Sequence, residues 1–103
     1  MNTEKVAFDI ISSAGDAKAE LDKALKFARE GKFTEAKAQL DVANKHLLKA
    51  HELQTKELLT REANGEKLEF NVLISHAQDY LMTTYTLKEV AAELINIYEL
   101  IKK

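Results

Sequence analysis

The sequence predicts an all-α protein: an up-down-up antiparallel bundle of three helices that forms a single domain over residues 1–103. Three observations predict it. The chain has no proline and only three glycines in 103 residues, and two of these glycines interrupt the pattern where links are expected. Apolar residues recur at three- and four-residue steps through three long segments, which is the spacing of one face of an α-helix. Short links between long helices favour antiparallel neighbours.

The composition is that of a soluble globular domain. Hydrophobic residues make up 46% and charged residues 31% of the chain, which is not typical of disorder. The net charge of −2 comes from 17 acidic and 15 basic residues, and no basic patch indicates nucleic acid or an anionic membrane. The absence of Cys excludes disulfides and thiolate chemistry. Without a secretory signal or a membrane-length apolar run, we expect a cytoplasmic protein without direct membrane insertion.

The first helix is expected from Thr3 or Glu4 to Arg29, just before Gly31. Its apolar face consists of Val6, Ile10, Ala14, Ala17, Leu21, Ala24 and Ala28. Gly15 lies inside this helix, where glycine costs roughly 1 kcal/mol relative to alanine. Such a glycine is more typical of close backbone packing than of function.

The second helix is expected to have Thr34 as its N-cap, with Phe33 as a hydrophobic staple to Ala38, and to end near Glu62. Its apolar face consists of Ala36, Leu40, Ala43, Leu47, Ala50, Gln54 and Leu58. The pattern then breaks at Asn64-Gly65, as expected where a helix leads into a loop.

The third helix, from about Lys67 or Phe70 to Lys102, has two apolar sides. The first stripe comprises Phe70, Leu73, Ala77, Leu81, Leu87, Ala91, Leu94, Tyr98 and Ile101. The second stripe, roughly on the opposite side, comprises Val72, Ser75, Asp79, Met82, Thr86, Val90, Ile97 and Leu100. A helix that is apolar on two sides is buried on two sides, and a three-helix monomer supplies only one partner side. The second stripe therefore predicts self-association around a symmetry axis.

His76 and Asp79 lie three residues apart in this helix, so their side chains project from one side. Such a pair is typical of a histidine whose ring is held in place, is charged or carries a bound group. Asp79 also belongs to the second stripe, and carboxylates about 4 Å apart at an axis repel by roughly 1 to 4 kcal/mol. A proton or a hard divalent cation such as Mg²⁺ would offset that repulsion. His76 lies one step off the stripe, where one ring nitrogen is reachable from outside.

Other polar residues give weaker signals. His46 and His51 are five residues apart and diverge by about 140°, so they do not form the one-face pair of a helical metal site. His51 and Gln54 lie near an apolar stripe, where buried polar groups need partners, and both are expected to contact polar atoms of the third helix. Asp16 is interpreted as a surface charge. From the residues alone, His76 is either a structural histidine at the helix surface or core edge that bonds to a neighbouring residue, or a functional group.

The segment His76-Ala77-Gln78-Asp79-Tyr80-Leu81-Met82 resembles the enzyme IIA component of the lactose/cellobiose (N,N'-diacetylchitobiose) family of the bacterial sugar phosphotransferase system. The likeness covers nearly the whole chain. Residues 10–17 resemble the family's first-helix segment, residues 30–36 its first turn, and residues 50–55 its second helix. A His-Ala-Gln-Asp motif with these flanks at these distances is a specific signal.

The resemblance implies a phosphotransferase component that forms a homotrimer of three-helix subunits. His76 would accept a phosphoryl group from the phosphocarrier HPr and pass it to a cysteine of the cognate enzyme IIB. The transfer would serve uptake of a lactose-, cellobiose- or chitobiose-type disaccharide, with the membrane component IIC as an indirect partner. Asp79 would bind a divalent metal, expected to be Mg²⁺, at the three-fold axis. Where the family often has a second histidine, this chain has Tyr80, whose phenol cannot take a proton near neutral pH.

The resemblance assigns no role to Gln78 or His51, and Gln78 is a candidate neighbour that orients the His76 ring. The sugar, the identity of the metal, any regulatory role and the role of Tyr80 stay open. One alternative is a helical adaptor that binds partner helices without chemistry, in which His76 is dispensable. Another is a histidine phosphotransfer domain of two-component signalling, which typically has a four-helix core and a different flank around its histidine.

Overall fold

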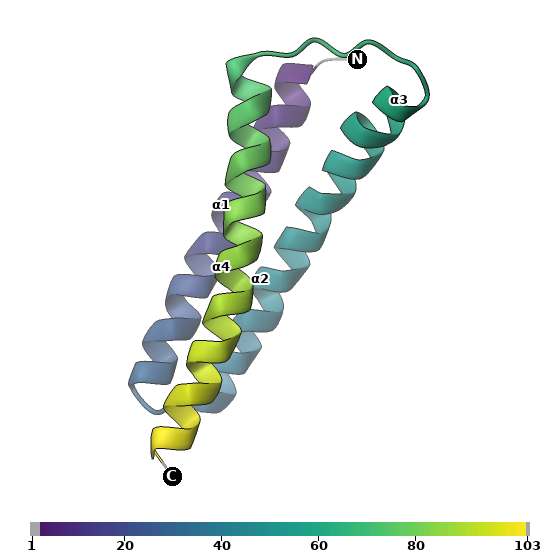
Figure 1. Ribbon diagram of the computed structural model, residues 1–103. Helices are drawn as coiled ribbons and strands as arrows, with labels where there is room; N and C mark the ends of the chain where they lie inside the picture. Colours follow the sequence, from purple (N-terminus) through teal and green to yellow (C-terminus); the bar gives the residue numbers. More distant parts are fainter. Residues whose placement is uncertain (1–2, 103) are drawn as a thin grey trace.

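The computed structural model describes residues 3–102 and shows three long helical rods side by side in an elongated bundle of 54 × 19 × 18 Å (Figure 1). The elements are α1 (Thr3–Arg29), α2 (Phe33–Gln54), a π-helical turn (Thr55–Leu59), α3 (Thr60–Ala63) and α4 (Val72–Lys102). The π turn and α3 continue α2 as one rod, because the residues at both junctions keep right-handed helical backbone angles. The predicted all-α fold with three antiparallel helices is confirmed over the described residues. Residues 1–2 and 103 of the predicted domain lie outside them.

Two buried clusters join the rods. The larger cluster draws on α1, α2, the π turn and α4, and comprises Val6, Ala7, Ile10, Ala17, Leu21, Ala43, Leu47, Ala50, Leu58, Ile74, Ala77, Leu81 and Ala91. The smaller cluster lies toward the α1–α2 link and comprises Ala24, Ala28, Ala36 and Ile95. Many of these residues are alanines, and small side chains at the contacts let helix axes approach closely. The bundle is therefore thin, and α4 turns only one side toward its core.

The start of α2 differs from the prediction. The helix begins at Phe33 with Lys32 as its N-cap, and no side chain caps this end. Thr34 is therefore not the N-cap, and Phe33 is not a staple to Ala38, which is exposed. Phe33 instead packs against the smaller cluster. The half-buried ring gains a part of the about 1.5–3 kcal/mol of full burial, which is comparable to the roughly 1 kcal/mol of an N-cap bond, so packing competes with capping at this boundary.

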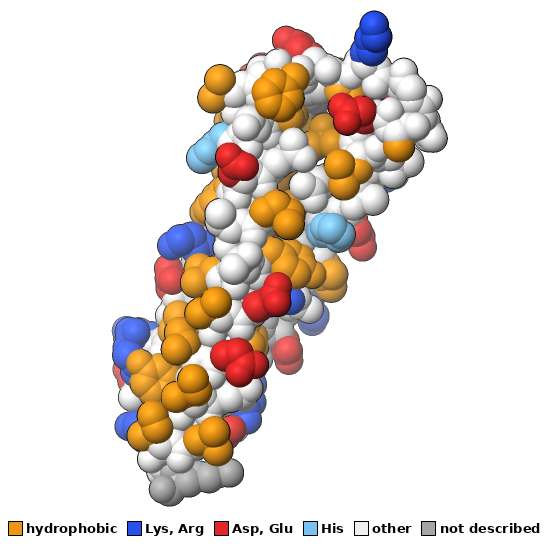
Figure 2. Space-filling model, viewed as in Figure 1, with side chains coloured by type: hydrophobic (Ala, Val, Ile, Leu, Met, Phe, Trp, Pro, Cys, Tyr) orange, Lys and Arg blue, Asp and Glu red, His pale blue; other side chains and the backbone are white. Residues whose placement is uncertain are grey.

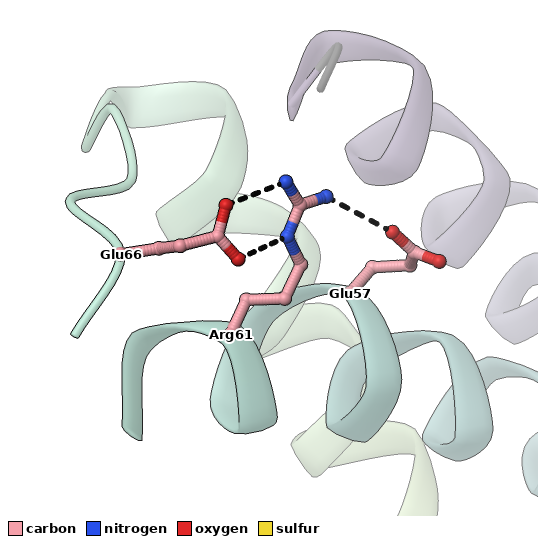
Figure 3. A network of polar contacts seen from close by, with 3 residues as sticks. All are labelled: Glu57, Arg61 and Glu66. Atoms are coloured by element: carbon pink, nitrogen blue, oxygen red, sulfur yellow. Dashed lines mark hydrogen bonds and ion pairs between the residues drawn. The ribbon is translucent and has the colours of Figure 1, made fainter. Parts of the chain in front are cut away.

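The loop between α3 and α4, residues 64–71, is tied down at its start by the Arg61 clamp, which consists of Arg61, Glu57 and Glu66. Arg61 donates from Nε and Nη2 to the two carboxylate oxygens of Glu66, both at 2.8 Å, and from Nη1 to Glu57 at 3.4 Å (Figure 3). These hydrogen bonds lower the pKa of the Glu66 carboxyl. The clamp therefore persists at neutral pH and loosens only when the pH falls through that lowered pKa.

Helix α4 begins at Val72, later than the predicted start at Lys67 or Phe70. Asn71 is the residue that starts it: its Oδ1 accepts a hydrogen bond from the backbone N–H of Ile74 at 2.9 Å. Asparagine is among the preferred N-cap residues, so this signal is present in the sequence. Because the helix starts here, Phe70 lies in the loop, 78% exposed, and is not part of the first stripe.

Replacing Asn71 by alanine is expected to lower the free energy of unfolding by about 0.5–2 kcal/mol, because the N–H of Ile74 loses its acceptor. Urea unfolding followed by circular dichroism measures the change. The matched control is Asn96→Ala, at an exposed position inside α4, where alanine is the better helix former and the change is neutral or slightly stabilising. Equal stability of the two variants would show that Asn71 does not support the helix start.

The first stripe of α4 is confirmed only in part. Most of its members are buried or half-buried, but Leu94 and Ile101 are 39% and 73% exposed. Leu94 lies three residues before Ile97, so it is only about 60° from the second stripe around the helix. Three residues outside the predicted stripe are buried instead: Ile74, Thr84 and Ile95.

The second stripe lies on the surface of the single chain, as expected of a side without a partner. Ser75 is half-buried and every other member is exposed, with Val72 at 84%, Ile97 at 48% and Leu100 at 68%. Figure 2 shows hydrophobic side chains gathered over α4, most densely toward its C-terminal end. Along residues 3–102, none of the helices combines the length and the apolar character needed to cross a bilayer.

Candidate functional site

His76 lies in the second turn of α4 with its side chain exposed. Within residues 3–102, neither ring nitrogen takes part in a hydrogen bond or an ion pair. The bundle core is filled from the other side of the helix, by Ala77 and Leu81. The imidazole is therefore not a satisfied core histidine, and its nitrogens are accessible to a molecule that approaches from outside.

An open hollow of about 550 Å³ lies beside the imidazole at the N-terminal end of α4. It is lined by Phe70, Asn71, Val72, Ser75, His76 and Asp79. The late start of α4 shapes this hollow, because Phe70 and the capping residue Asn71 stand at its edge instead of continuing the helix. The site thus combines an imidazole, a carboxylate and exposed apolar surface.

His76 and Asp79 share this hollow, as their three-residue spacing predicts, but no hydrogen bond joins them. The Asp79 side chain is exposed, and its carboxylate has no hydrogen bond or ion pair within the described chain. The Thr83 hydroxyl donates to the backbone oxygen of Asp79 at 2.8 Å, not to its carboxylate. The carboxylate therefore does not orient the imidazole within one chain, and it is available to a ligand from outside.

The ring that does contact His76 is that of Tyr80, one turn later. The two ring centroids are 6.1 Å apart and the ring planes differ by 14°, which is an offset parallel stack. The phenol end of Tyr80 reaches α1: a Cβ added to Gly15 would lie 3.5 Å from Oη. This is an ordinary contact distance to a side chain, so the predicted close backbone packing at Gly15 is wrong, and the Tyr80 ring lies beside this position instead. The sequence analysis does not predict the contact between His76 and Tyr80, although their four-residue spacing signals it.

Gln78 points away from His76. Two residues along a helix turn the side chain by about 200°, and Gln78 accepts a hydrogen bond through Oε1 from Nε2 of Gln54 at 3.3 Å. Gln54 is only 5% exposed, so its predicted polar contact with the third helix is confirmed. Within one chain, Gln78 joins α4 to α2 and forms no hydrogen bond with His76.

The other polar candidates lie away from the hollow. His51 is exposed and faces the ring of Tyr85 at a tilt of 57°, with 6.1 Å between ring centroids, instead of a polar partner. Nδ1 of His46 is buried without a hydrogen-bond partner, and Asp16 is exposed as predicted.

A metal site is not complete in one chain. Within the described part of the molecule, no three His, Cys, Asp or Glu side chains are grouped so that they could hold a metal ion. Asp79 offers one carboxylate that has no partner among the described residues, so the described chain by itself does not supply a set of protein ligands for a metal there.

Comparison with known proteins extends the likeness over the whole bundle. The sequence model of the family described as "PTS system, Lactose/Cellobiose specific IIA subunit" matches residues 5–99. The lichenan-specific phosphotransferase enzyme IIA component of Bacillus subtilis is 43% identical over 96 residues, which cover 93% of this chain and 86% of that protein. The match to the family model covers α1 from Lys5 onward, α2 and all of the residues that line the hollow.

Two solved structures share the fold closely. The crystal structure of the cellobiose-specific enzyme IIA from Bacillus anthracis has a TM-score of 0.94 and 41% identity, covering 99% of this chain and 93% of that one. The solution structure of the IIA(chitobiose)–HPr complex from Escherichia coli has a TM-score of 0.82 and 32% identity, covering 100% of this chain and 99% of that one.

Proposed function

Because the chain belongs to the lactose/cellobiose-specific IIA subunits of the sugar phosphotransferase system, we propose that His76 carries a phosphoryl group from HPr to a cysteine of the cognate enzyme IIB. As a family member, the chain is a phosphotransferase component. The choice of His76 rests on its geometry: the imidazole is exposed at an open hollow, and neither ring nitrogen has a partner among residues 3–102. The similar IIA that was solved with HPr supports HPr as the donor.

The chemistry needs only one accessible nitrogen. In neutral imidazole one nitrogen carries the proton and the other a lone pair. The lone pair of His76 attacks phosphorus, a phosphorus–nitrogen bond forms, and the bond to the donor atom on HPr breaks with its electrons staying on that atom. A cysteine thiolate of enzyme IIB then attacks the same phosphorus, and the electrons of the phosphorus–nitrogen bond return to His76. Such transfers depend mainly on positioning and charge stabilisation.

The open hollow suits a carrier, because two partners can reach the same atom in turn. We place the transported sugar among lactose-, cellobiose- and chitobiose-type disaccharides, whose recognition would lie in the membrane component IIC. The test is labelling: the chain should take up one phosphoryl group per protomer from phosphorylated HPr and lose it when enzyme IIB is added. A chain that binds HPr but is never labelled would instead fit the helical adaptor.

The same proposal includes a trimer with a divalent metal at its axis. The exposed second stripe supports assembly around α4, and the free Asp79 carboxylate on that stripe supports a metal ligand in each copy. Carboxylate oxygens suit a hard cation such as Mg²⁺. When bound, the ion would supply the positive charge that offsets repulsion among three carboxylates. A single Asp79 carboxylate from each chain can share one metal ion only if the copies associate at the axis.

Replacing Asp79 by leucine is expected to abolish divalent metal binding while preserving or tightening association. Leucine removes the like charges and extends the apolar stripe. Titration calorimetry with Mg²⁺ and analytical ultracentrifugation measure the two effects. The matched control is Asp41→Leu, at an exposed carboxylate on α2, which should change neither. A purely monomeric Asp79→Leu chain would count against an axis along this stripe.

A further inference from the structure

We infer that Tyr80 is a positioning residue for His76: seated against α1 at Gly15, its ring holds the imidazole in the orientation that meets the phosphoryl donor. The inference rests on the proposed role of His76 as phosphoryl acceptor. In this inference the ring of Tyr80 restrains the imidazole by contact and takes no part in bond making or bond breaking.

Among residues 3–102, no hydrogen bond or ion pair restrains the His76 ring. An exposed imidazole without hydrogen bonds is free to rotate about its side-chain bonds, yet transfer to phosphorus requires the attacking lone pair to lie in line. Within the described residues, the ring contact recorded for His76 is the stack on Tyr80, with planes 14° apart. A flat neighbour on one side restricts the ring orientations, while the exposed imidazole stays accessible from the hollow.

The Tyr80 ring, in turn, lies against another helix. The ring is half-buried between α4 and α1, and a Cβ on Gly15 would lie 3.5 Å from its Oη and 3.9 Å from Cε2. These are ordinary contact distances, so alanine would fit at position 15, whereas the extra methyl groups of a β-branched side chain would push the ring away. A small residue inside α1 thus makes the seat for Tyr80, and α1 thereby sets the position of a ring on α4.

The face of the Tyr80 ring, and not its hydroxyl group, contacts His76. Within residues 3–102, Oη forms no hydrogen bond. Phenylalanine should therefore replace Tyr80 without loss, whereas leucine, which has no flat face, should not. This difference separates positioning from a direct contact between the hydroxyl and the phosphoryl group.

The test measures single-turnover transfer from phosphorylated HPr at a series of HPr concentrations. Tyr80→Leu and Gly15→Val should each lower the maximal rate by about 10- to 100-fold, the effect of a misplaced reacting group, while the HPr concentration at half-maximal rate changes little. Tyr80→Phe and Gly15→Ala should keep the rate within about threefold. Ala19→Val, an exposed position one turn along α1, controls for a β-branched residue in that helix and should transfer normally.

A double variant tests whether both positions act through one ring. Tyr80→Leu with Gly15→Val should transfer no more slowly than the slower single variant, because residues acting through a shared group are not additive. Additive losses would overturn the link between Gly15 and the Tyr80 ring. If Tyr80→Phe loses as much of the transfer rate as Tyr80→Leu, the hydroxyl group and not the ring face acts on the transfer, and the positioning role is refuted. A wild-type transfer rate in Tyr80→Leu would refute any role of Tyr80.

A second measurement depends neither on transfer nor on the disruptive variants. Nuclear Overhauser contacts between the His76 ring and the ring at position 80 should appear in the unmodified chain and in Tyr80→Phe, and their absence would refute the stack. Failure of the proposed function is distinct, since the unmodified chain would then not be labelled by HPr at all. A labelled chain whose Tyr80→Leu variant transfers normally would refute the positioning role alone.

Discussion

Replacing His76 by alanine is expected to abolish phosphoryl transfer from HPr and leave the helical fold intact. The loss should be complete, because the substitution removes the attacking nitrogen itself. The fold should survive because the side chain is exposed and outside both buried clusters, and substitutions at such sites usually change stability by less than about 0.5 kcal/mol. The measurement is the amount of labelled phosphate retained per chain, with far-ultraviolet circular dichroism as the check on helicity.

The matched control is His51→Ala, because His51 is also an exposed histidine beside a tyrosine ring. It should be labelled as fully as the unmodified chain. Stoichiometric labelling of His76→Ala would refute His76 as the acceptor, and loss of labelling in His51→Ala alone would move the acceptor to α2. The pair of variants therefore decides between the two exposed imidazoles as well as between a carrier and an adaptor.

The helices were largely predictable from the sequence because their faces follow simple periodicity. Helix α1 spans Thr3–Arg29 as predicted, and Gly31 and Gly65 do end rods, with φ of 78° and 92° that other residues rarely adopt. The predicted helix boundaries that were wrong are those where two local signals in the sequence compete. At the α2 start, burial of Phe33 prevails over capping by Thr34. At the α4 start, the cap at Asn71 prevails over the apolar pattern that begins earlier.

The candidate site was predictable only where it depends on one helix. Three-residue spacing correctly places His76 and Asp79 on one side of α4, whereas burial of the second stripe at an axis stays a prediction. The seat of Tyr80 on Gly15 and the bond from Gln54 to Gln78 depend on how neighbouring helices lie against each other, which no local pattern specifies. The π turn at Thr55–Leu59 also has no distinguishing signal in its residues.

Replacing Ile97 by glutamate is expected to dissociate the proposed trimer into folded monomers. Ile97 follows Asp79 by about five full helical turns, so both lie on one line of the second stripe, and Ile97 is 48% exposed in the single chain. Burying the exposed half of each isoleucine at an axis is worth about 0.7–1.5 kcal/mol, and three glutamates there would add repulsion. Since about 1.4 kcal/mol is a factor of ten, loss of three such contacts should lower the association constant by at least about 30-fold.

Sedimentation velocity over a range of concentrations measures the change, and Ala38→Glu, at an exposed position on α2, controls for the added charge. A monomeric Ile97→Glu chain with normal helicity also separates two properties of the site. If it still accepts phosphate from HPr, the acceptor geometry around His76 is complete within one chain, as the Tyr80 stack indicates. If labelling is lost with the fold intact, a neighbouring copy supplies part of the site. An Ile97→Glu chain that stays trimeric would remove the second stripe from the interface, and Asp79 would then have no axis at which to bind a metal.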